Sequence, residues 1–328
     1  SDRLCPIGSD PTMEAFVTTY AVIGAGAVGG FYGAKLAQAG SDVHFLFRDD
    51  AEYVRTNGLD VRSVDGDFVL EDVSAHEEWS TLPEVDVVIV AVKSNANADV
   101  APRIPAILRP GGAVLLIQNG LGSEPLFAQA IANQGEVIGG LAFINSERTA
   151  RNQVTHMGNG GLTIAGYLPD YAAAGITDWM RAIAADFEGT SVPIQLDEDL
   201  VLSRWTKLLW NIPYNGLSVL LQASTADIMN DPKSTELVES IMAEVVAAAA
   251  ADGRELPAGL PELMLEATRT MKPYATSMKV DFDNNRPLEV ESIIGEPLRR
   301  GQGLGAPMPV TETLYRSLSF INSRITSS

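Results

Sequence analysis

A lysine and two asparagines recur at intervals of four residues in a segment rich in tryptophan and leucine. On a helix, Lys207, Asn211 and Asn215 lie in a row on one face. One interpretation is a lysine that faces a cleft, with amides that orient a small polar ligand. The other is a buried polar network that ties the helix to its neighbours, because buried polar groups need partners. Pro213 falls between the two asparagines and is expected to distort the helix there.

A serine and a glutamate farther along the chain are further candidates for chemistry. Ser277 opens the segment Ser-Met-Lys-Val-Asp, and Glu289 follows Pro287 by two residues. Proline favours the first position of a helix, so we expect the Glu289 carboxylate in a first helical turn. An acidic side chain there also interacts favourably with the helix dipole, so Glu289 has a purely structural interpretation as well.

A glycine-rich turn near the start of the chain predicts a nucleotide site. An apolar strand from residue 20 runs into Gly-Ala-Gly-Ala-Val-Gly and then into a helical pattern. The first glycine allows a tight turn, the second lets a pyrophosphate approach the backbone, and the third lets the helix pack on the strand. The N–H groups at the start of the helix would face the phosphates. The predicted cofactor-binding residues here are Gly24, Ala25, Gly26, Ala27, Val28 and Gly29.

An arginine at the end of the second strand favours NADP(H) over NAD(H). The strand begins at Asp42, and Arg48 stands where NAD enzymes place an acidic residue for the ribose hydroxyls. A guanidinium suits a 2′-phosphate because it carries a permanent charge and a planar set of donors. Asp49 and Asp50 follow, and they would either oppose a phosphate or cap the next helix. The alternative for Arg48 is a solvated surface charge.

Strand and helix patterns predict two domains with different folds. Residues 19–195 alternate strands and helices, which predicts an α/β, Rossmann-type domain that binds NADP. Residues 196–328 carry helical spacing of apolar residues, which predicts a mostly α-helical C-terminal domain for substrate binding and catalysis. Residues 1–18 would form an N-terminal arm or a remnant that is not native, since Met13 is a candidate natural start.

Polar residues follow two apolar strands that are predicted at 85–92 and 113–117. Lys93 comes directly after the first strand, and Asn119 comes shortly after the second. Ligands in open α/β sheets bind beyond the carboxyl ends of the strands, so both side chains are expected at the cleft.

Glycine-punctuated β-like segments between residues 154 and 165 can extend the predicted parallel sheet.

Charge and composition exclude several classes of protein. The 328-residue chain has 23 Lys and Arg against 42 Asp and Glu, and its net charge of −19 argues against nucleic acids and anionic membrane surfaces as partners. No apolar run has the length of a membrane span, and the first residues lack a secretory pattern. Cys5 is the only cysteine, which favours a reducing cytoplasm. Histidines at positions 44, 76 and 156 lack metal-ligand spacing, so no metal site is predicted.

Taken together, these segments resemble the ketopantoate reductase family, 2-dehydropantoate 2-reductases that use NADPH. The resemblance runs from about residue 19 to residue 323. It rests on the glycine turn, Arg48, the ends of the two strands, Trp-x-Lys-Leu-x-x-Asn-x-x-x-Asn from 205 to 215, Ser277-Met278, Glu289 in a Glu-x-Glu segment where the family often shows Glu-x-Asp, and Gly-Ala-Pro-Met-Pro at 305–309.

The resemblance implies reduction of 2-dehydropantoate to (R)-pantoate with NADPH, in pantothenate and coenzyme A biosynthesis. It implies that Lys207 is a general acid that hydrogen-bonds the keto oxygen, and that Glu289 interacts with the substrate hydroxyl and with this lysine. The implied substrate-binding residues are Asn119, Asn211, Asn215 and Ser277, and the implied cofactor contacts in the cleft are Lys93 and Asn119.

Two other functions remain open from the sequence. One is a reductase of another bulky 2-keto acid, of the D-2-hydroxyacid dehydrogenase type. The other is a non-catalytic dinucleotide-binding sensor, which the joint presence of Lys207, Asn211, Ser277 and Glu289 disfavours because a sensor needs none of them. The expected partner is a small-molecule 2-keto acid. A homodimer is one assembly open to the chain, and the sequence leaves the oligomeric state undecided.

Overall fold

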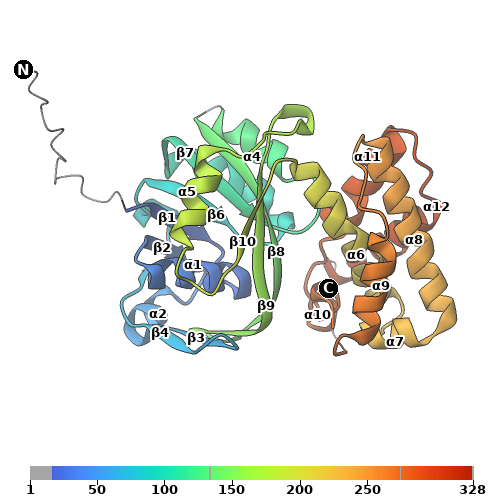
Figure 1. The fold of residues 1–328 in the computed structure, drawn as a ribbon. Coiled ribbons are helices and arrows are strands. Elements are labelled where there is room, and N and C mark those ends of the chain that lie inside the picture. Colours follow the sequence, from blue (N-terminus) through green and yellow to red (C-terminus); the bar gives the residue numbers. More distant parts are fainter. Residues whose placement is uncertain (1–16, 133, 274, 327–328) are drawn as a thin grey trace, which may run out of the picture.

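The computed structural model describes residues 17–132, 134–273 and 275–326. The first half is built on one large sheet and the second half on helices, with α6 (Leu200–Leu220) at their boundary (Figure 1). The predicted sequence of an α/β, Rossmann-type region and then a mostly α-helical region is therefore confirmed. Residues 1–16, which include Cys5, Met13 and most of the predicted arm, lie outside the described residues.

The strands of the sheet do not lie in chain order. They are β1 (Thr19–Ile23), β2 (Asp42–Leu46), β3 (Leu59–Ser63), β4 (Phe68–Leu70), β5 (Ser74–His76), β6 (Val85–Val90), β7 (Leu108–Ile117), β8 (Gly135–Ala150), β9 (Gln153–Gly166) and β10 (Ile194–Asp197). Their order across the sheet is β4-β3-β9-β8-β7-β6-β1-β2-β5, and β10 pairs with β9. The chain order reverses between β1 and β6, and a parallel sheet opens its ligand crevice at such a reversal.

β8 and β9 form a long antiparallel hairpin, which corrects the predicted arrangement of parallel strands with crossover helices. The chain turns at Arg151 and Asn152, and β9 runs back beside β8. The β-like segments expected between residues 154 and 165 all belong to β9, which lies inside the sheet between β3 and β8. Register shifts in the hairpin, one of them after Phe143, interrupt the regular alternation of its side chains.

Helices cover both faces of the sheet. α1 (Ala27–Ala39) and α5 (Asp178–Asp186) cover one face, while α4 (Glu124–Ile131) and η3 (Ala101–Ala106) cover the other. Every residue of β6 is buried, as expected for an apolar strand covered on both faces. The shorter helices of this half are α2 (Ala51–Asn57), α3 (Asn97–Val100), η1 (Trp79–Thr81), η2 (Ser94–Ala96) and η4 (Pro169–Tyr171).

Helices of the second half pack around α6. They are α7 (Thr225–Asn230), α8 (Pro232–Ala251), α9 (Leu260–Thr270), α10 (Ser277–Asp283), the π-helical segment η5 (Glu291–Gly295), α11 (Glu296–Gly303) and α12 (Pro309–Thr326). α8, α10 and α12 contact α6 directly, and its apolar residues form the core of this half. α6 continues as one helix through Pro213, so the expected distortion does not interrupt it between Asn211 and Asn215.

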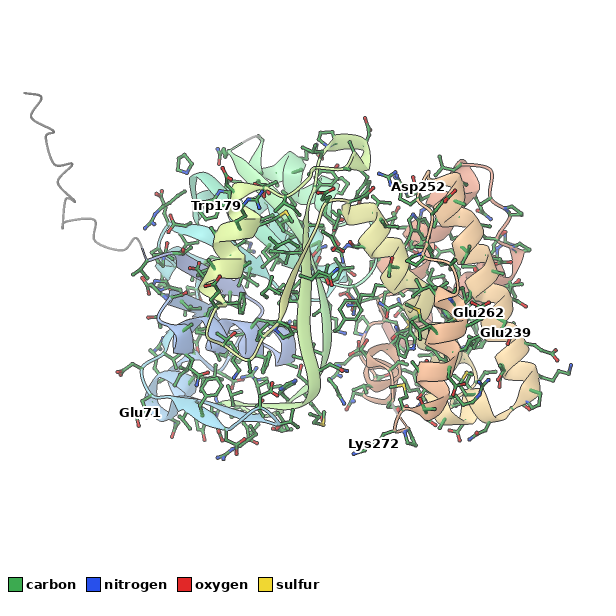
Figure 2. The ribbon with its side chains drawn as sticks, in the orientation of Figure 1. Glu71, Trp179, Glu239, Asp252, Glu262 and Lys272 are labelled. Atoms are coloured by element: carbon green, nitrogen blue, oxygen red, sulfur yellow. The ribbon has the colours of Figure 1, made fainter. Side chains whose placement is uncertain are left out.

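Buried polar contacts attach α6 to the sheet and to the other helices. Arg204 forms a fully buried ion pair with Glu124 at 2.5 Å and donates a hydrogen bond to the Gln118 carbonyl oxygen at 2.6 Å. The next residue, Trp205, donates a hydrogen bond from its Nε1 to Asp252, which lies at the end of α8 (Figure 2). Because a buried charge without its partner is costly, the Arg204 contacts hold α6 against the sheet half, and the Trp205 contact attaches it to α8.

Candidate active site

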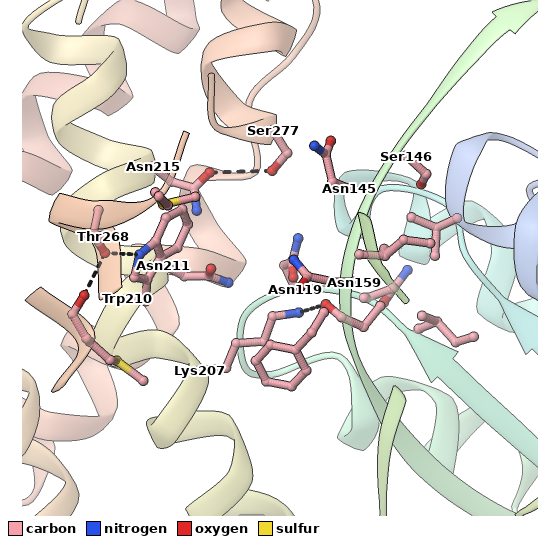
Figure 3. A pocket seen from close by; sticks show the side chains of 18 of the residues that line it. Asn119, Asn145, Ser146, Asn159, Lys207, Trp210, Asn211, Asn215, Thr268 and Ser277 are labelled. Carbon is pink, nitrogen blue, oxygen red and sulfur yellow. Dashed lines mark hydrogen bonds between the residues drawn. The ribbon is translucent and has the colours of Figure 1, made fainter. Parts of the chain in front are cut away.

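A cavity of about 580 Å³ lies between the sheet and the helical half (Figure 3). Its walls come from the end of β7, the β8–β9 hairpin, α6, α9 and the start of α10. The predicted site residues that line it are Val28, Lys93, Asn119, Lys207, Asn211, Asn215 and Ser277. Among the described residues, Arg48, Glu289 and the rest of the glycine turn lie outside this lining. The cavity therefore brings together side chains from segments that are far apart in the sequence.

The Lys207 amine extends from α6 toward the sheet. Its Nζ donates a hydrogen bond to the Ala142 carbonyl oxygen at 2.5 Å and lies 5.0 Å from the centre of the Phe143 ring. Burial lowers the pKa of Lys207 to about 7. The charge of Arg204 lowers this pKa too, while the charge of Glu289 acts in the opposite direction. An amine with this pKa gains and loses a proton readily at neutral pH, which suits a general acid.

Asn211 and Asn215 both face the cavity from α6, as their spacing with Lys207 predicts. Asn211 is buried, and its amide makes no hydrogen bond to any other residue that the structure describes. Asn215 Oδ1 accepts hydrogen bonds from Ser277 Oγ at 3.4 Å and from the Met278 backbone N–H at 3.3 Å. Asn211 thus matches the cleft interpretation of this helix face, and Asn215 also matches the polar-network interpretation.

Glu289 lies beside the strand end that carries Lys93. It immediately precedes the helical segment that begins at Val290, one position before the expected first turn. Its Oε1 accepts hydrogen bonds from the Ser94 N–H at 2.8 Å and from Ser94 Oγ at 2.9 Å, and its Oε2 lies 3.2 Å from Lys93 Nζ. Lys93 Nζ also contacts Asp281 at 2.7 Å. These contacts join the two halves of the molecule.

Opposing effects act on the charge of Lys93. Desolvation favours its neutral form, but Glu289 and Asp281 outweigh this effect and raise the pKa of Lys93. The result contrasts with Lys207, whose pKa is lowered in the same cavity. Lys93 therefore stays charged at neutral pH, while Lys207 is close to its titration point.

The glycine turn before α1 has the shape that a dinucleotide requires. Gly24 has a φ of +95°, and a Cβ there would come within 2.8 Å of the Val92 backbone nitrogen. A Cβ on Gly29 would come within 2.3 Å of the Gly24 carbonyl oxygen. A Cβ on Gly26 would meet open space, so packing alone does not require glycine at that position. Open space beside the start of a helix is what a pyrophosphate needs, and the turn therefore fits NADP(H).

Arg48 lies just beyond β2 and is exposed, without a hydrogen bond or ion pair among the residues described here. Asp50 occupies the N-cap position of α2, but its side chain makes no capping hydrogen bond. Its carboxylate instead pairs with Arg148 at 2.8 Å and Arg151 at 2.7 Å. The Asp50 side chain therefore does not play the capping role that the sequence left open, and its charge is already matched.

Several polar residues of the cavity wall were not predicted. Asn145, Ser146 and Asn159 come from the β8–β9 hairpin and face the cavity from the side opposite α6 (Figure 3). The Ser146 hydroxyl is buried without a partner within the described part of the chain, and Asn159 has a φ of +61°. No local sequence signal reveals these residues, because the register shifts of the hairpin decide where its side chains point.

Within residues 17–132, 134–273 and 275–326, no three His, Cys, Asp or Glu side chains are grouped as a metal site would require. The helices formed by these same residues include none that is both long and apolar enough to cross a membrane.

Pairing of β2 with β5 brings two of the scattered histidines together, with His44 Nδ1 3.1 Å from His76 Nε2.

Comparison with known proteins places the chain in a family. The family model described as ketopantoate reductase PanE/ApbA matches residues 20–169, and the model of its C-terminal part matches residues 199–322. A 2-dehydropantoate 2-reductase from Nostoc sp. is 47% identical over 305 residues, which are 93% of this chain and 95% of the relative.

Solved structures agree with these matches over nearly the whole chain. The crystal structure of 2-dehydropantoate 2-reductase from Geobacter metallireducens GS-15 has a TM-score of 0.86 and 38% identity, and the match covers 92% of this chain and 99% of that one. The enzyme of the same name from Methylococcus capsulatus has a TM-score of 0.86 and 34% identity, over 94% of this chain and 98% of that one. The chain therefore belongs to the ketopantoate reductase family of oxidoreductases.

Proposed function

We propose that this chain catalyses the NADPH-dependent reduction of 2-dehydropantoate to (R)-pantoate, a step of pantothenate and coenzyme A biosynthesis. One observation carries the proposal: a lysine with a pKa of about 7 and two asparagine amides share a cavity beside a dinucleotide-type glycine turn. The name of the 47% identical relative supports the same reaction. A sensor protein would have no use for a lysine with a pKa matched to proton transfer.

The proposal assigns the cofactor to residues 19–195 and the catalytic and substrate groups to residues 196–328. The backbone of residues 24–29 would hold the pyrophosphate, and Arg48 would pair with the 2′-phosphate. When bound, NADPH supplies the hydride that reduces the keto carbon. Lys93 and Asn119 line the cavity at the strand ends, where a cofactor and a substrate would meet.

Lys207 acts as the general acid in this proposal. Reduction places negative charge on the keto oxygen, and an ammonium group beside it stabilises that charge and then transfers its proton to the oxygen. The neutral amine left on Lys207 regains a proton from solvent. The amine donates one hydrogen bond to the Ala142 carbonyl oxygen, and the ammonium form has further N–H groups that a keto oxygen in the cavity would accept from.

Amides and a hydroxyl orient the substrate around this acid. Asn211 has hydrogen-bonding groups to offer, because its buried amide has no partner among the described residues. Ser277 and Asn215 would bind the substrate carboxylate and neighbouring oxygens, and Asn119 faces them from the end of β7. Orientation of this kind lowers the entropy cost of reaching the transition state.

Glu289 acts chiefly through other residues in this proposal. Its carboxylate holds Lys93 and Ser94 and favours the charged form of Lys207. It is therefore a positioning residue in the geometry described here. The direct contact with a substrate hydroxyl that the family resemblance implies stays a prediction.

NADPH oxidation with a panel of 2-keto acids tests the proposed function. The panel includes 2-dehydropantoate and 3-methyl-2-oxobutanoate, which lacks the distal hydroxyl. We expect the highest kcat/KM with 2-dehydropantoate and NADPH. Preference for the simpler keto acid would favour a reductase of the D-2-hydroxyacid dehydrogenase type, and no turnover with any member would leave only a binding protein.

We also propose a homodimer in a cytoplasmic setting. Three large apolar side chains are exposed close to the end of α6 and on α12, which packs against it. They are Leu220 and Leu221 at the end of α6 and Phe320 on α12. Light scattering after gel filtration measures the assembly state directly.

Cell fractionation tests the proposed cytoplasmic location, which rests on the single cysteine of the sequence.

A further inference from the structure

Two arginines at the tip of the β8–β9 hairpin form ion pairs with Asp50, which follows Arg48 by two residues. Arg148 Nη2 lies 2.8 Å from Asp50 Oδ2, and Arg151 Nε lies 2.7 Å from Asp50 Oδ1. The Arg148 guanidinium also lies over the Phe47 ring, 5.5 Å from its centre. The hydrogen bond from Arg151, together with the charge of Arg148, holds the pKa of Asp50 below its ordinary value.

Contacts behind the arginines hold the hairpin tip in place. Asn152 Nδ2 donates a hydrogen bond to the Gly58 carbonyl oxygen at 3.1 Å, and the Asn152 carbonyl oxygen accepts one from the Asp60 N–H at 2.7 Å. Gln153 Nε2 donates to Asp60 Oδ2 at 2.7 Å. The hairpin is therefore attached beyond the end of α2 as well as at its start, and this fixes the position of both arginines.

Charge at this site depends on the hairpin. The site contains three arginines, Arg48, Arg148 and Arg151, and two aspartates, Asp49 and Asp50. It therefore has one net positive charge, although the whole chain has a net charge of −19. Without the two hairpin arginines, the loop after β2 would be net negative. A negative loop would repel a phosphate, because like charges at short range weaken binding.

We propose that Arg148 and Arg151 determine cofactor specificity by neutralising Asp50, so that Arg48 can attract the 2′-phosphate of NADPH. This inference rests on the proposed function, which places that phosphate at Arg48. The specificity site is then composite: Arg48 comes from the loop after β2, and its electrostatic support comes from a hairpin about 100 residues later. Loss of Arg151 leaves Asp50 paired with Arg148 alone and removes the net positive charge of the site, whereas loss of the Asp50 charge makes Arg151 dispensable.

Calorimetric titration with adenosine 2′,5′-bisphosphate and with AMP tests the inference, because the two ligands differ only by the 2′-phosphate. We expect R151Q to weaken binding of the bisphosphate about three- to fivefold, the range of a partly screened charge pair. AMP affinity should not change. The double variant D50N/R151Q should bind the bisphosphate as the unmodified protein does. NADPH titrations should follow the bisphosphate in every variant.

R316Q is the matched control, because it removes an exposed arginine that pairs with Glu312 on the distant helix α12. It should leave both affinities unchanged. Failure of D50N to restore bisphosphate binding, or an equal loss for AMP, would overturn the inference and leave Arg151 as a structural residue. R48A separates this failure from that of the proposed cofactor. If neither the unmodified protein nor R48A prefers the bisphosphate to AMP, the assignment of the 2′-phosphate to Arg48 is wrong. If R48A loses this preference but R151Q keeps it, only the hairpin inference is wrong.

Discussion

The glycine turn before α1 and the helical wall of the cavity are built in different ways. The glycine turn works through side chains that are missing: Gly24 and Gly29 have no room for a Cβ, and Gly26 leaves space open. On the helical side, Lys207 and Asn211 work through side chains whose properties depend on burial and on distant neighbours. A binding turn made of backbone leaves a short local pattern in the sequence. A wall made of side chains acquires its chemistry only when other segments pack around it.

Removal of the cation on the helical wall should have the largest effect. We expect K207A to lower kcat by about two to four orders of magnitude, because one group supplies both charge stabilisation and the proton. NADPH binding, measured by fluorescence titration, should stay near normal because the glycine turn is untouched. Turnover within a few-fold of the unmodified enzyme would return Lys207 to a structural role.

A side chain added to the glycine turn should have the next largest effect. We expect G26A to raise the Kd for NADPH about ten- to a hundredfold, because the new methyl group occupies space that charge-assisted contacts to the pyrophosphate need. Thermal stability should not change, since that Cβ meets open space. G303A is the control, because its Cβ also meets open space but lies on α11. A loss of stability in G26A would show that the turn is shaped by packing instead.

Glu289 connects the two halves of the molecule, and its charge should appear in the pH dependence of the reaction. Reduction needs protonated Lys207, so kcat/KM should fall as the pH rises through the pKa of about 7. Glu289 raises that pKa, and E289Q should therefore move the fall to lower pH and reduce kcat/KM at neutral pH by about three- to tenfold. D281N is the control, since Asp281 contacts Lys93 but is not among the groups that shift Lys207.

The same variant separates two roles of Glu289. A positioning residue affects every substrate alike, so E289Q should lower kcat/KM for 2-dehydropantoate and for 3-methyl-2-oxobutanoate by the same factor. A larger loss with 2-dehydropantoate would instead mean that Glu289 binds the distal hydroxyl, because a site built for a hydroxyl discriminates strongly against its absence.

Asn211 and Asn215 offer the finest comparison, because they share one helix face but not one environment. We expect N211A to raise KM about fivefold with little change in thermal stability, since its amide has no partner within the described chain. N215A should cost about 1 kcal/mol of stability, because the Met278 N–H loses its acceptor. Thermal unfolding and steady-state kinetics of both variants measure the difference. Equal stability losses would contradict the contrast.

Local patterns predicted much of the fold but not its sheet order. The helical spacing predicted after residue 196 includes α6, and the apolar strand predicted at residues 85–92 corresponds to β6, because both patterns reflect which side chains must be buried. The β8–β9 hairpin was missed because its turn at Arg151 and Asn152 carries no strong turn signal, whereas the Asn159-Gly160 pair lies inside β9. The position of Asn145 and Ser146 in the cavity follows from that pairing, so it could not be predicted either.

By itself, the sequence determined the order of the α/β and helical regions, the glycine turn, and the shared helix face of Lys207, Asn211 and Asn215. Each of these follows from backbone restrictions or periodicity within about ten residues. Only the tertiary structure decided the lowered pKa of Lys207, the partners of Glu289 and the arginines that pair with Asp50. Desolvation and ion pairing depend on which distant segments meet, and no local pattern records that meeting.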